Sequence, residues 1–140
     1  FLRHMVRNIV GTLLLVGDLG FFYDRNGLWH GHLPANLRIV LLNNHGGGIF
    51  GMIEGPERLA PAIREQYFLT PQALNAARTA ADYGLDYQCA HTRHELHQAL
   101  PAFMTDTGRP ALLEVETGMD ANTAVYGQFK TLMAAQHLPT

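Results

Sequence analysis

Residues 38–51 read RIVLLNNHGGGIFG, an unbroken apolar run followed by two asparagines and a glycine-rich turn. An apolar run without alternation is typical of a strand that is covered on both faces, as in a parallel sheet. A similar run, TLLLVG, occupies residues 12–17 and is followed at once by Asp18. The 20 residues between the two runs can hold one right-handed helical crossover, which we assign to residues 21–32. The sequence therefore predicts two parallel neighbouring strands whose carboxyl ends carry Asp18 and Asn44.

Further strands and helices alternate along the rest of the chain. Strands are predicted at residues 111–117 and, from a weaker pattern, at residues 86–90; helices are predicted at residues 72–83, 92–103 and 128–136. Such alternation is typical of a parallel sheet with helical crossovers. The expected fold class is therefore α/β, a doubly wound parallel sheet with helices on both faces.

Local signals set the ends of these helices. The Thr-Pro pair at residues 70–71 predicts an N-cap with proline in the first helical position, and Gly84 is placed to end that helix. Thr92 and Glu95 have the capping-box spacing. Pro101 lies within the predicted helix and is expected to bend or shorten it.

Composition limits the classes of protein. With 140 residues, 47% hydrophobic and 16% charged, the chain is expected to form one globular domain with a real core. A net charge of −2 gives no electrostatic case for nucleic acid, and the apolar run at residues 9–16 is too short to span a membrane. The single cysteine, Cys89, fits a reducing compartment, so a cytoplasmic location is expected. Because the chain begins at Phe1 and enters core sequence almost at once, we expect a fragment of something longer.

The glycine-rich turn contains a literal G-x-G-x-x-G at Gly46, Gly48 and Gly51. A dinucleotide site requires a long helix directly after the glycines and an acidic residue about 20 positions further on. Here Gly55 and Pro56 interrupt after a few residues, and no strand ends in an acid at the required place. A Walker phosphate loop is excluded because no Gly-Lys-Ser/Thr follows.

A metal site is the better interpretation of this edge. Asp18 would offer a charged oxygen, Asn44 a neutral one, and the carbonyl of Gly46 a third if the turn folds back. Magnesium takes about six oxygens and keeps water and phosphate oxygens among them. Asp and Asn also favour turns and helix caps, so a purely structural role stays open for both.

The same residues carry a resemblance to a known family. Gly17-Asp18 and Asn43-Asn44, with Asn43 lying 25 positions after Asp18, resemble the thiamine-diphosphate motif of 2-oxo-acid decarboxylases and acetolactate synthases. The stretches GDLGFFYDRNGLWH (17–30), RIVLLNNHGGGIFGMIEGP (38–56) and ANTAVYGQFK (121–130) are similar to the 2-succinyl-5-enolpyruvyl-6-hydroxy-3-cyclohexene-1-carboxylate (SEPHCHC) synthases of menaquinone biosynthesis. The general motif has glycine where this chain has Leu19. The resemblance implies the C-terminal diphosphate-binding domain, residues 1–140, of a three-domain subunit.

The resemblance also implies a role for particular residues. Asp18, Asn44 and the Gly46 carbonyl would hold Mg²⁺ or Mn²⁺ against the diphosphate, while Ile49 and Phe50 would border the thiazolium ring and the substrate. The residues implied to line the cofactor are Gly17, Asp18, Leu19, Gly20, Asn44, Gly46, Gly47, Gly48 and Ile49.

The activity implied is that of a transferase. A family member would decarboxylate 2-oxoglutarate and add the resulting succinyl unit to isochorismate. The acid–base glutamate of the family comes from an N-terminal domain of a neighbouring subunit, so a homodimer or homotetramer is implied, and this chain alone is expected to be inactive. Two alternatives stay open: another thiamine-diphosphate enzyme, such as an acetolactate synthase or 2-oxo-acid decarboxylase, and a non-catalytic α/β binding module.

Other polar residues are given structural interpretations. His91, His94 and His97 recur every third residue, but no cysteine or carboxylate pair completes a metal shell in the sequence, so a solvated helix face is expected. Cys89 is expected to be a small buried apolar residue.

Overall fold

The computed structural model describes residues 6–8, 11–53 and 55–136. The chain divides into two compact units. The first, called here the sheet unit, comprises Phe1–Asn43 and Leu74–Glu116; the second, called the glycine-loop unit, comprises Asn44–Ala73 and Thr117–Thr140.

The sheet unit is built on five strands in the order β1-β2-β3-β5-β4. The strands are β1 (Val6–Asn8), β2 (Gly11–Gly17), β3 (Leu37–Asn43), β4 (Asp86–Ala90) and β5 (Ala111–Glu116). The last four are parallel to one another, which confirms the predicted α/β fold with a parallel sheet. β1 pairs antiparallel with β2 and was not predicted, because three residues are too few to show a strand pattern.

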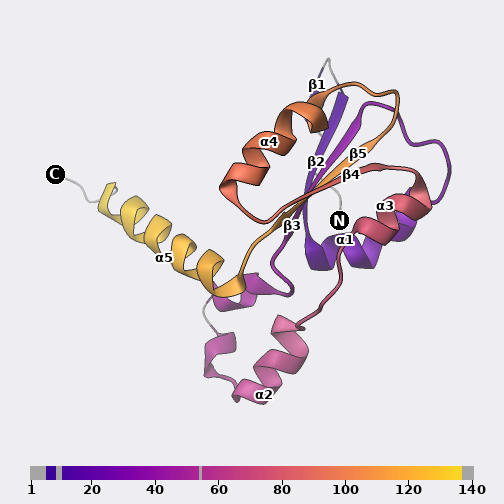
Figure 1. The fold of residues 1–140 in the computed structure, drawn as a ribbon. Helices are drawn as coiled ribbons and strands as arrows, with labels where there is room; N and C mark the ends of the chain where they lie inside the picture. The colour runs from indigo at the N-terminus through magenta and orange to yellow at the C-terminus, as the bar shows by residue number, and fades with distance from the viewer. Residues whose placement is uncertain (1–5, 9–10, 54, 137–140) are drawn as a thin grey trace. The chain divides into compact units, whose positions relative to one another are not determined.

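Helices cover both faces of this sheet (Figure 1). On one face, Phe21 of α1 (Asp18–Asp24) and Ala80 of α3 (Ala77–Tyr83) share a buried cluster with Ile39 and Leu41 of β3. On the other face, Phe103 of α4 (Arg93–Met104) packs with Leu113 and its neighbours on β5. The apolar run of β3 thus serves two cores, one on each side of the strand. The expectation that the run of β2 is covered on both faces is wrong, because Leu13 and Leu15 are exposed.

Two of the predicted helices that pack on the sheet start or end elsewhere. The helix predicted at residues 21–32 begins and ends earlier: α1 begins at Asp18 and passes into a 3₁₀ turn, η1 (Arg25–Leu28). The helix predicted at 72–83 begins only at Ala77, although Gly84, at φ 71°, ends it as expected. Thr70 is not an N-cap, because its backbone is left-handed (φ 39°) and its N–H donates to the Glu65 carbonyl, closing the preceding helical turn.

The capping prediction for α4 is confirmed in its main contact. Thr92 Oγ1 accepts the N–H of Glu95 at 3.2 Å, and the Glu95 carboxylate turns back to the N–H of His91 at 2.7 Å. Of the two effects expected of Pro101, shortening is wrong, since α4 continues to Met104, and bending stays a prediction. Thr105 Oγ1 donates to the Pro101 carbonyl at 2.8 Å and so satisfies an acceptor in the last turn.

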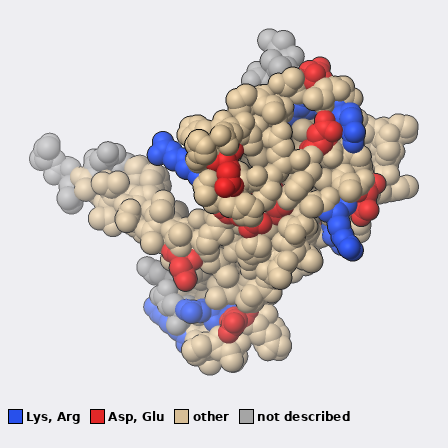
Figure 2. All heavy atoms as spheres, viewed as in Figure 1, with Lys and Arg blue, Asp and Glu red and all other residues tan. Residues whose placement is uncertain are grey.

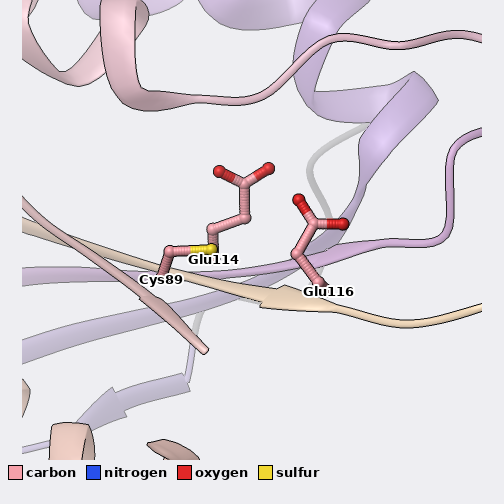
Figure 3. A group of neighbouring side chains, drawn as sticks. All are labelled: Cys89, Glu114 and Glu116. Atoms are coloured by element: carbon pink, nitrogen blue, oxygen red, sulfur yellow. The ribbon is translucent and has the colours of Figure 1, made fainter. Parts of the chain in front are cut away.

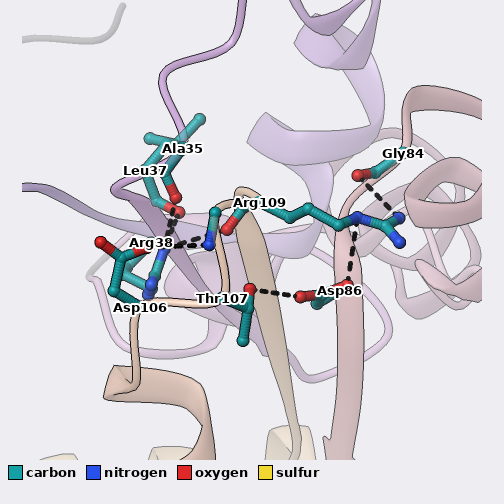
Figure 4. Close-up of polar contacts among 9 residues, drawn as sticks. Ala35, Leu37, Arg38, Gly84, Asp86, Asp106, Thr107 and Arg109 are labelled. Atoms are coloured by element: carbon teal, nitrogen blue, oxygen red, sulfur yellow. Dashed lines mark hydrogen bonds and ion pairs between the residues drawn. The ribbon is translucent and has the colours of Figure 1, made fainter.

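A polar network ties together the amino ends of β3, β4 and β5 (Figure 4). The buried guanidinium of Arg38 donates to the backbone carbonyls of Ala35, Leu37, Thr105 and Arg109. Arg109 in turn lies 3.3 Å from the carboxylate of Asp86, at the start of β4. These contacts fix the amino edge of the sheet, and the candidate residues follow the strands at the opposite, carboxyl edge.

The glycine-loop unit contains short helical turns and one long helix. Its elements are η2 (Gly48–Gly51), η3 (Pro56–Arg58), α2 (Pro61–Arg64), the π-helical turn η4 (Glu65–Leu69) and α5 (Met119–Gln136). α5 is longer than the predicted 128–136, because its first turns pack beside the glycine loop: Met119 lies against Gly46 and Gly48, and Thr123 against Gly51. In the part of the chain that the structure describes, no helix is long and apolar enough to cross a membrane.

Charged side chains show no separation by sign on the face drawn in Figure 2. Lysine and arginine lie interspersed with aspartate and glutamate on that face. This distribution agrees with the small net charge of −2.

Candidate functional site

The carboxyl ends of β2 and β3 lie side by side in the sheet unit. The two strands are parallel and in register, with Gly17 opposite Leu42. Asp18 follows β2 directly as the first residue of α1 and is 3% exposed. Asn43 is the last residue of β3, is fully buried, and is joined by its peptide to Asn44. In doubly wound sheets this edge is where ligands bind.

The glycine loop in the second unit is held by backbone hydrogen bonds. Gly47 N–H donates to the Leu69 carbonyl at 2.6 Å, and Gln72 N–H donates to the His45 carbonyl at 3.1 Å. Gly48 N–H donates back to the Gly46 carbonyl at 2.9 Å, which closes a tight turn at Gly47 (φ −78°, ψ 56°). The loop therefore has a defined backbone rather than the freedom that three glycines suggest.

Close packing explains why this loop contains three consecutive glycines. A Cβ added at Gly46, whose φ is 156°, would lie 2.6 Å from the Leu69 carbonyl oxygen. At Gly47 it would meet the Phe68 carbonyl, and at Gly48 the side-chain amide of Asn44. After Gly48 the chain forms only the short turn η2. The structure therefore also excludes a dinucleotide site here, because such a site needs a long helix at this point.

The remaining predicted residues fall into the same two units. Gly17, Leu19 and Gly20 surround the start of α1 in the sheet unit, where a Cβ would meet nothing at Gly17 and only an ordinary contact at Gly20. Ile49 and Phe50 belong to η2. Ile49 is 62% exposed, whereas the ring of Phe50 packs edge-on against Phe68 with centroids 5.4 Å apart.

One polar residue behind this edge escaped the sequence analysis. Glu114 lies in the middle of β5, is fully buried, and accepts hydrogen bonds from Asn43, Ala76 and Tyr87. Burial and the bond to Glu114 raise the pKa of the Tyr87 phenol, so Tyr87 keeps its proton and donates it. The sequence signal that could have pointed to Glu114 is an acidic residue between the apolar neighbours Leu113 and Val115 of a predicted strand.

Glu114 also belongs to a cluster with Cys89 and Glu116, whose ligand atoms all lie within 4.8 Å of one another. Figure 3 shows the two carboxylates on the same side of β5 with the Cys89 sulfur beside Glu114. Cys89 is half-buried rather than buried as predicted, and lies 3.6 Å from His91 Nε2. Burial raises the pKa of the Cys89 thiol, which disfavours the thiolate that binds metals. His91, His94 and His97 are exposed, as expected for a solvated face.

Comparisons with known proteins give relatives but no matching family model. The chain is 44% identical over 125 residues to a protein of Cytophaga hutchinsonii, a match covering 89% of this chain and 22% of that protein. It is 38% identical over 128 residues to a protein of Porphyromonas gingivalis, covering 91% of this chain and 22% of the relative. A protein of Christiangramia forsetii is 37% identical over 120 residues, covering 86% and 20%.

All three relatives carry the name 2-succinyl-5-enolpyruvyl-6-hydroxy-3-cyclohexene-1-carboxylate synthase. The chain spans about a fifth of the length of these curated relatives. Over that segment, the chain is a homologue of the SEPHCHC synthases.

Proposed function

We propose that this chain is the C-terminal diphosphate- and metal-binding domain of a thiamine-diphosphate-dependent SEPHCHC synthase. The whole three-domain protein would decarboxylate 2-oxoglutarate and transfer the succinyl unit to isochorismate in menaquinone biosynthesis. The observation that carries the proposal is the match to SEPHCHC synthases at 37–44% identity over most of the chain. The matched chain contains both strand ends and the glycine loop.

The residues present have the chemistry that a metal-bound diphosphate requires. Carboxylate, carboxamide and carbonyl oxygens are the ligands that Mg²⁺ and Mn²⁺ prefer, and Asp18, Asn44 and Gly46 supply one of each. The Gly46 carbonyl accepts the Gly48 N–H, but a carbonyl oxygen has two lone pairs, so this bond is compatible with a metal contact. The glycines pack against the carbonyls of Phe68 and Leu69 and the side chain of Asn44, and this packing fixes the backbone that carries the Gly46 carbonyl.

We assign the residues as follows. Asp18, Asn44 and the Gly46 carbonyl hold the ion, and the backbones of residues 17–20 and 46–48 line the diphosphate. Ile49 and Phe50 provide apolar contact beside the thiazolium ring and the substrate. Thiamine diphosphate, when bound, supplies the electron sink for decarboxylation and carbon–carbon bond formation. The chain's own residues bind and orient it, and apolar side chains limit the access of water.

The proposal includes a division of labour between domains. The acid–base glutamate and most groups that bind the substrate carboxylates would come from other domains, including one from a second subunit. This chain would then form half of each active site within a homodimer or homotetramer. By itself it would bind the cofactor weakly and would not turn over substrate.

A location-specific binding experiment tests the assignment even if affinity is low. Paramagnetic Mn²⁺ broadens the NMR signals of nuclei close to it, so the ¹⁵N-labelled chain is titrated with Mn²⁺ in the presence of thiamine diphosphate. We expect broadening to centre on Asp18, Asn44 and Gly46. The variant Asp18→Ala, which removes the charged ligand, should lose this broadening. Asp82→Ala removes an exposed carboxylate from α3 and serves as the matched control.

The outcomes are distinct. Loss of broadening in Asp18→Ala with retention in Asp82→Ala supports the site. Broadening that survives Asp18→Ala, or that centres on residues outside these strand ends and the glycine loop, contradicts it.

A further inference from the structure

The buried carboxylate of Glu114 joins three elements of the sheet unit. Its Oε1 accepts from Asn43 Nδ2 at 2.7 Å, at the end of β3. Its Oε2 accepts from the Ala76 N–H at 2.9 Å, just before α3, and from the Tyr87 hydroxyl at 2.6 Å, on β4. The two oxygens therefore hold different parts of the structure: Oε1 holds β3, and Oε2 holds α3 and β4.

The Asn43 side chain is fixed by this arrangement. Its Nδ2 donates both to Glu114 and to the Leu74 carbonyl at 2.9 Å, so both amide hydrogens are engaged. Rotating the amide would place an oxygen against the Leu74 carbonyl and the Glu114 carboxylate, which is repulsive. The last residue of β3 therefore has one orientation, and its peptide leads directly into Asn44.

Stability does not account for a carboxylate at this position. Burying a carboxylate is costly, and apolar replacement of buried charged groups is often neutral or stabilising. Glu114 lies in a strand whose preceding residues, Leu112 and Leu113, are fully buried leucines. Among the described residues no cationic side chain pairs with Glu114, so the three donors alone offset its loss of water. An apolar residue would fill the core but could not orient Asn43.

We propose that Glu114 is a positioning residue for the metal site: by holding Asn43 it fixes the peptide that carries Asn44 and so sets the Asn44 side chain for the ion. This inference rests on the proposed function, since it concerns a residue assigned there as a metal ligand. Glu114 itself does not contact the ion or the cofactor. Its effect passes through one hydrogen bond and one peptide unit.

The division between the two oxygens allows a matched test. Glu114→Leu removes both acceptor oxygens and leaves an apolar side chain, so Asn43 loses its bond to residue 114. Tyr87→Phe removes a bond to Oε2 and leaves the Oε1 bond to Asn43 intact. Asn43→Leu removes the same bond from the other side, and it tests the proposal if Glu114→Leu does not fold.

The experiment measures three quantities for the wild-type chain and each variant. The thermal midpoint reports stability, the ¹⁵N shifts of the Asn44 and Gly46 amides without ligand report the geometry of the loop, and titration with Mg²⁺ and thiamine diphosphate reports affinity. We expect Glu114→Leu and Asn43→Leu to move those shifts and to weaken binding about tenfold or more, the loss typical of groups that orient metal ligands. Tyr87→Phe should lower the thermal midpoint but leave the shifts and the affinity near wild type.

The two levels of the proposal fail in different ways. If the wild-type chain binds and Glu114→Leu or Asn43→Leu binds equally well, the positioning role is wrong and the proposed function stands. If Tyr87→Phe weakens binding as much as Glu114→Leu, affinity merely follows stability, and the positioning role is again wrong. If the wild-type chain does not bind the probe at all, the assigned metal site fails and the positioning role fails with it.

Discussion

Replacing Gly46 with alanine tests the packed backbone that carries a proposed metal ligand. Gly46 has φ 156°, a conformation that side chains rarely adopt, and its missing Cβ would lie 2.6 Å from the Leu69 carbonyl oxygen. That neighbour is backbone, so it cannot rotate aside as a flexible side chain would. The alanine variant must therefore move residues 46–47 away from residue 69, and the bond from Gly47 N–H to Leu69 is the first to be lost.

The size of the effect follows from two terms. A side chain in so unfavourable a backbone region costs about 1–3 kcal/mol, and one backbone hydrogen bond contributes about 0.5–1.5 kcal/mol. The loop should therefore be destabilised locally by about 1.5–4.5 kcal/mol. Because about 1.4 kcal/mol corresponds to a factor of ten, the Gly47 amide should open roughly 10- to 1600-fold more often.

Amide hydrogen exchange measures that opening residue by residue. In Gly46→Ala we expect faster exchange at Gly47 and Gln72, whose N–H groups bond within the loop unit, and unchanged exchange in β3 and β5 of the sheet unit. Gly127→Ala is the matched control, because Gly127 lies inside α5 with nothing within 4 Å of its added Cβ. Wild-type exchange at Gly47 in Gly46→Ala would refute the packing argument.

Two further predictions concern single contacts in the sheet unit. Thr92→Ala removes the cap of α4 and should lower the free energy of unfolding by about 1 kcal/mol, measured by urea denaturation, while Thr92→Ser should retain most of it; equal losses would contradict the capping role. Tyr87 has a pKa raised above its ordinary value of 10.0, so the folded chain keeps a proton that the unfolded chain releases above that pH. The contribution of Tyr87 to stability is therefore complete below about pH 10 and declines as the pH rises further. The difference in the free energy of unfolding between wild type and Tyr87→Phe should shrink at high pH. A difference that stays constant would show that the phenolic proton is not involved.

Elements with strong local signals were predictable from the sequence. The four parallel strands appear close to their predicted positions because long apolar runs have few other places in a folded domain. Gly84 ends α3 and Thr92 caps α4 because both act on backbone groups within a few residues. The candidate ligands Asp18 and Asn44 were likewise found from spacing alone, and their roles stay predictions.

Elements that depend on distant partners were missed or misplaced. β1 is defined by its pairing with β2, and its three residues are too few to show a strand pattern in the sequence. The start of α3 was placed too early because the Thr-Pro pair at residues 70–71 looks like a helix start. In the structure, Thr70 instead closes η4 in a left-handed conformation. α5 extends toward its amino end because Met119 and Thr123 pack beside the glycine loop, a contact that no local pattern encodes.

The sequence by itself determined the parallel strands, the residues at their carboxyl ends and the homology to SEPHCHC synthases. Only the tertiary structure decided what lies behind those ends. Glu114 and Asn43 are 71 residues apart in the chain, and neither residue type signals the other. Their hydrogen bond exists because β3 and β5 pair in the interior, where a carboxylate must find donors from the protein once it has lost water.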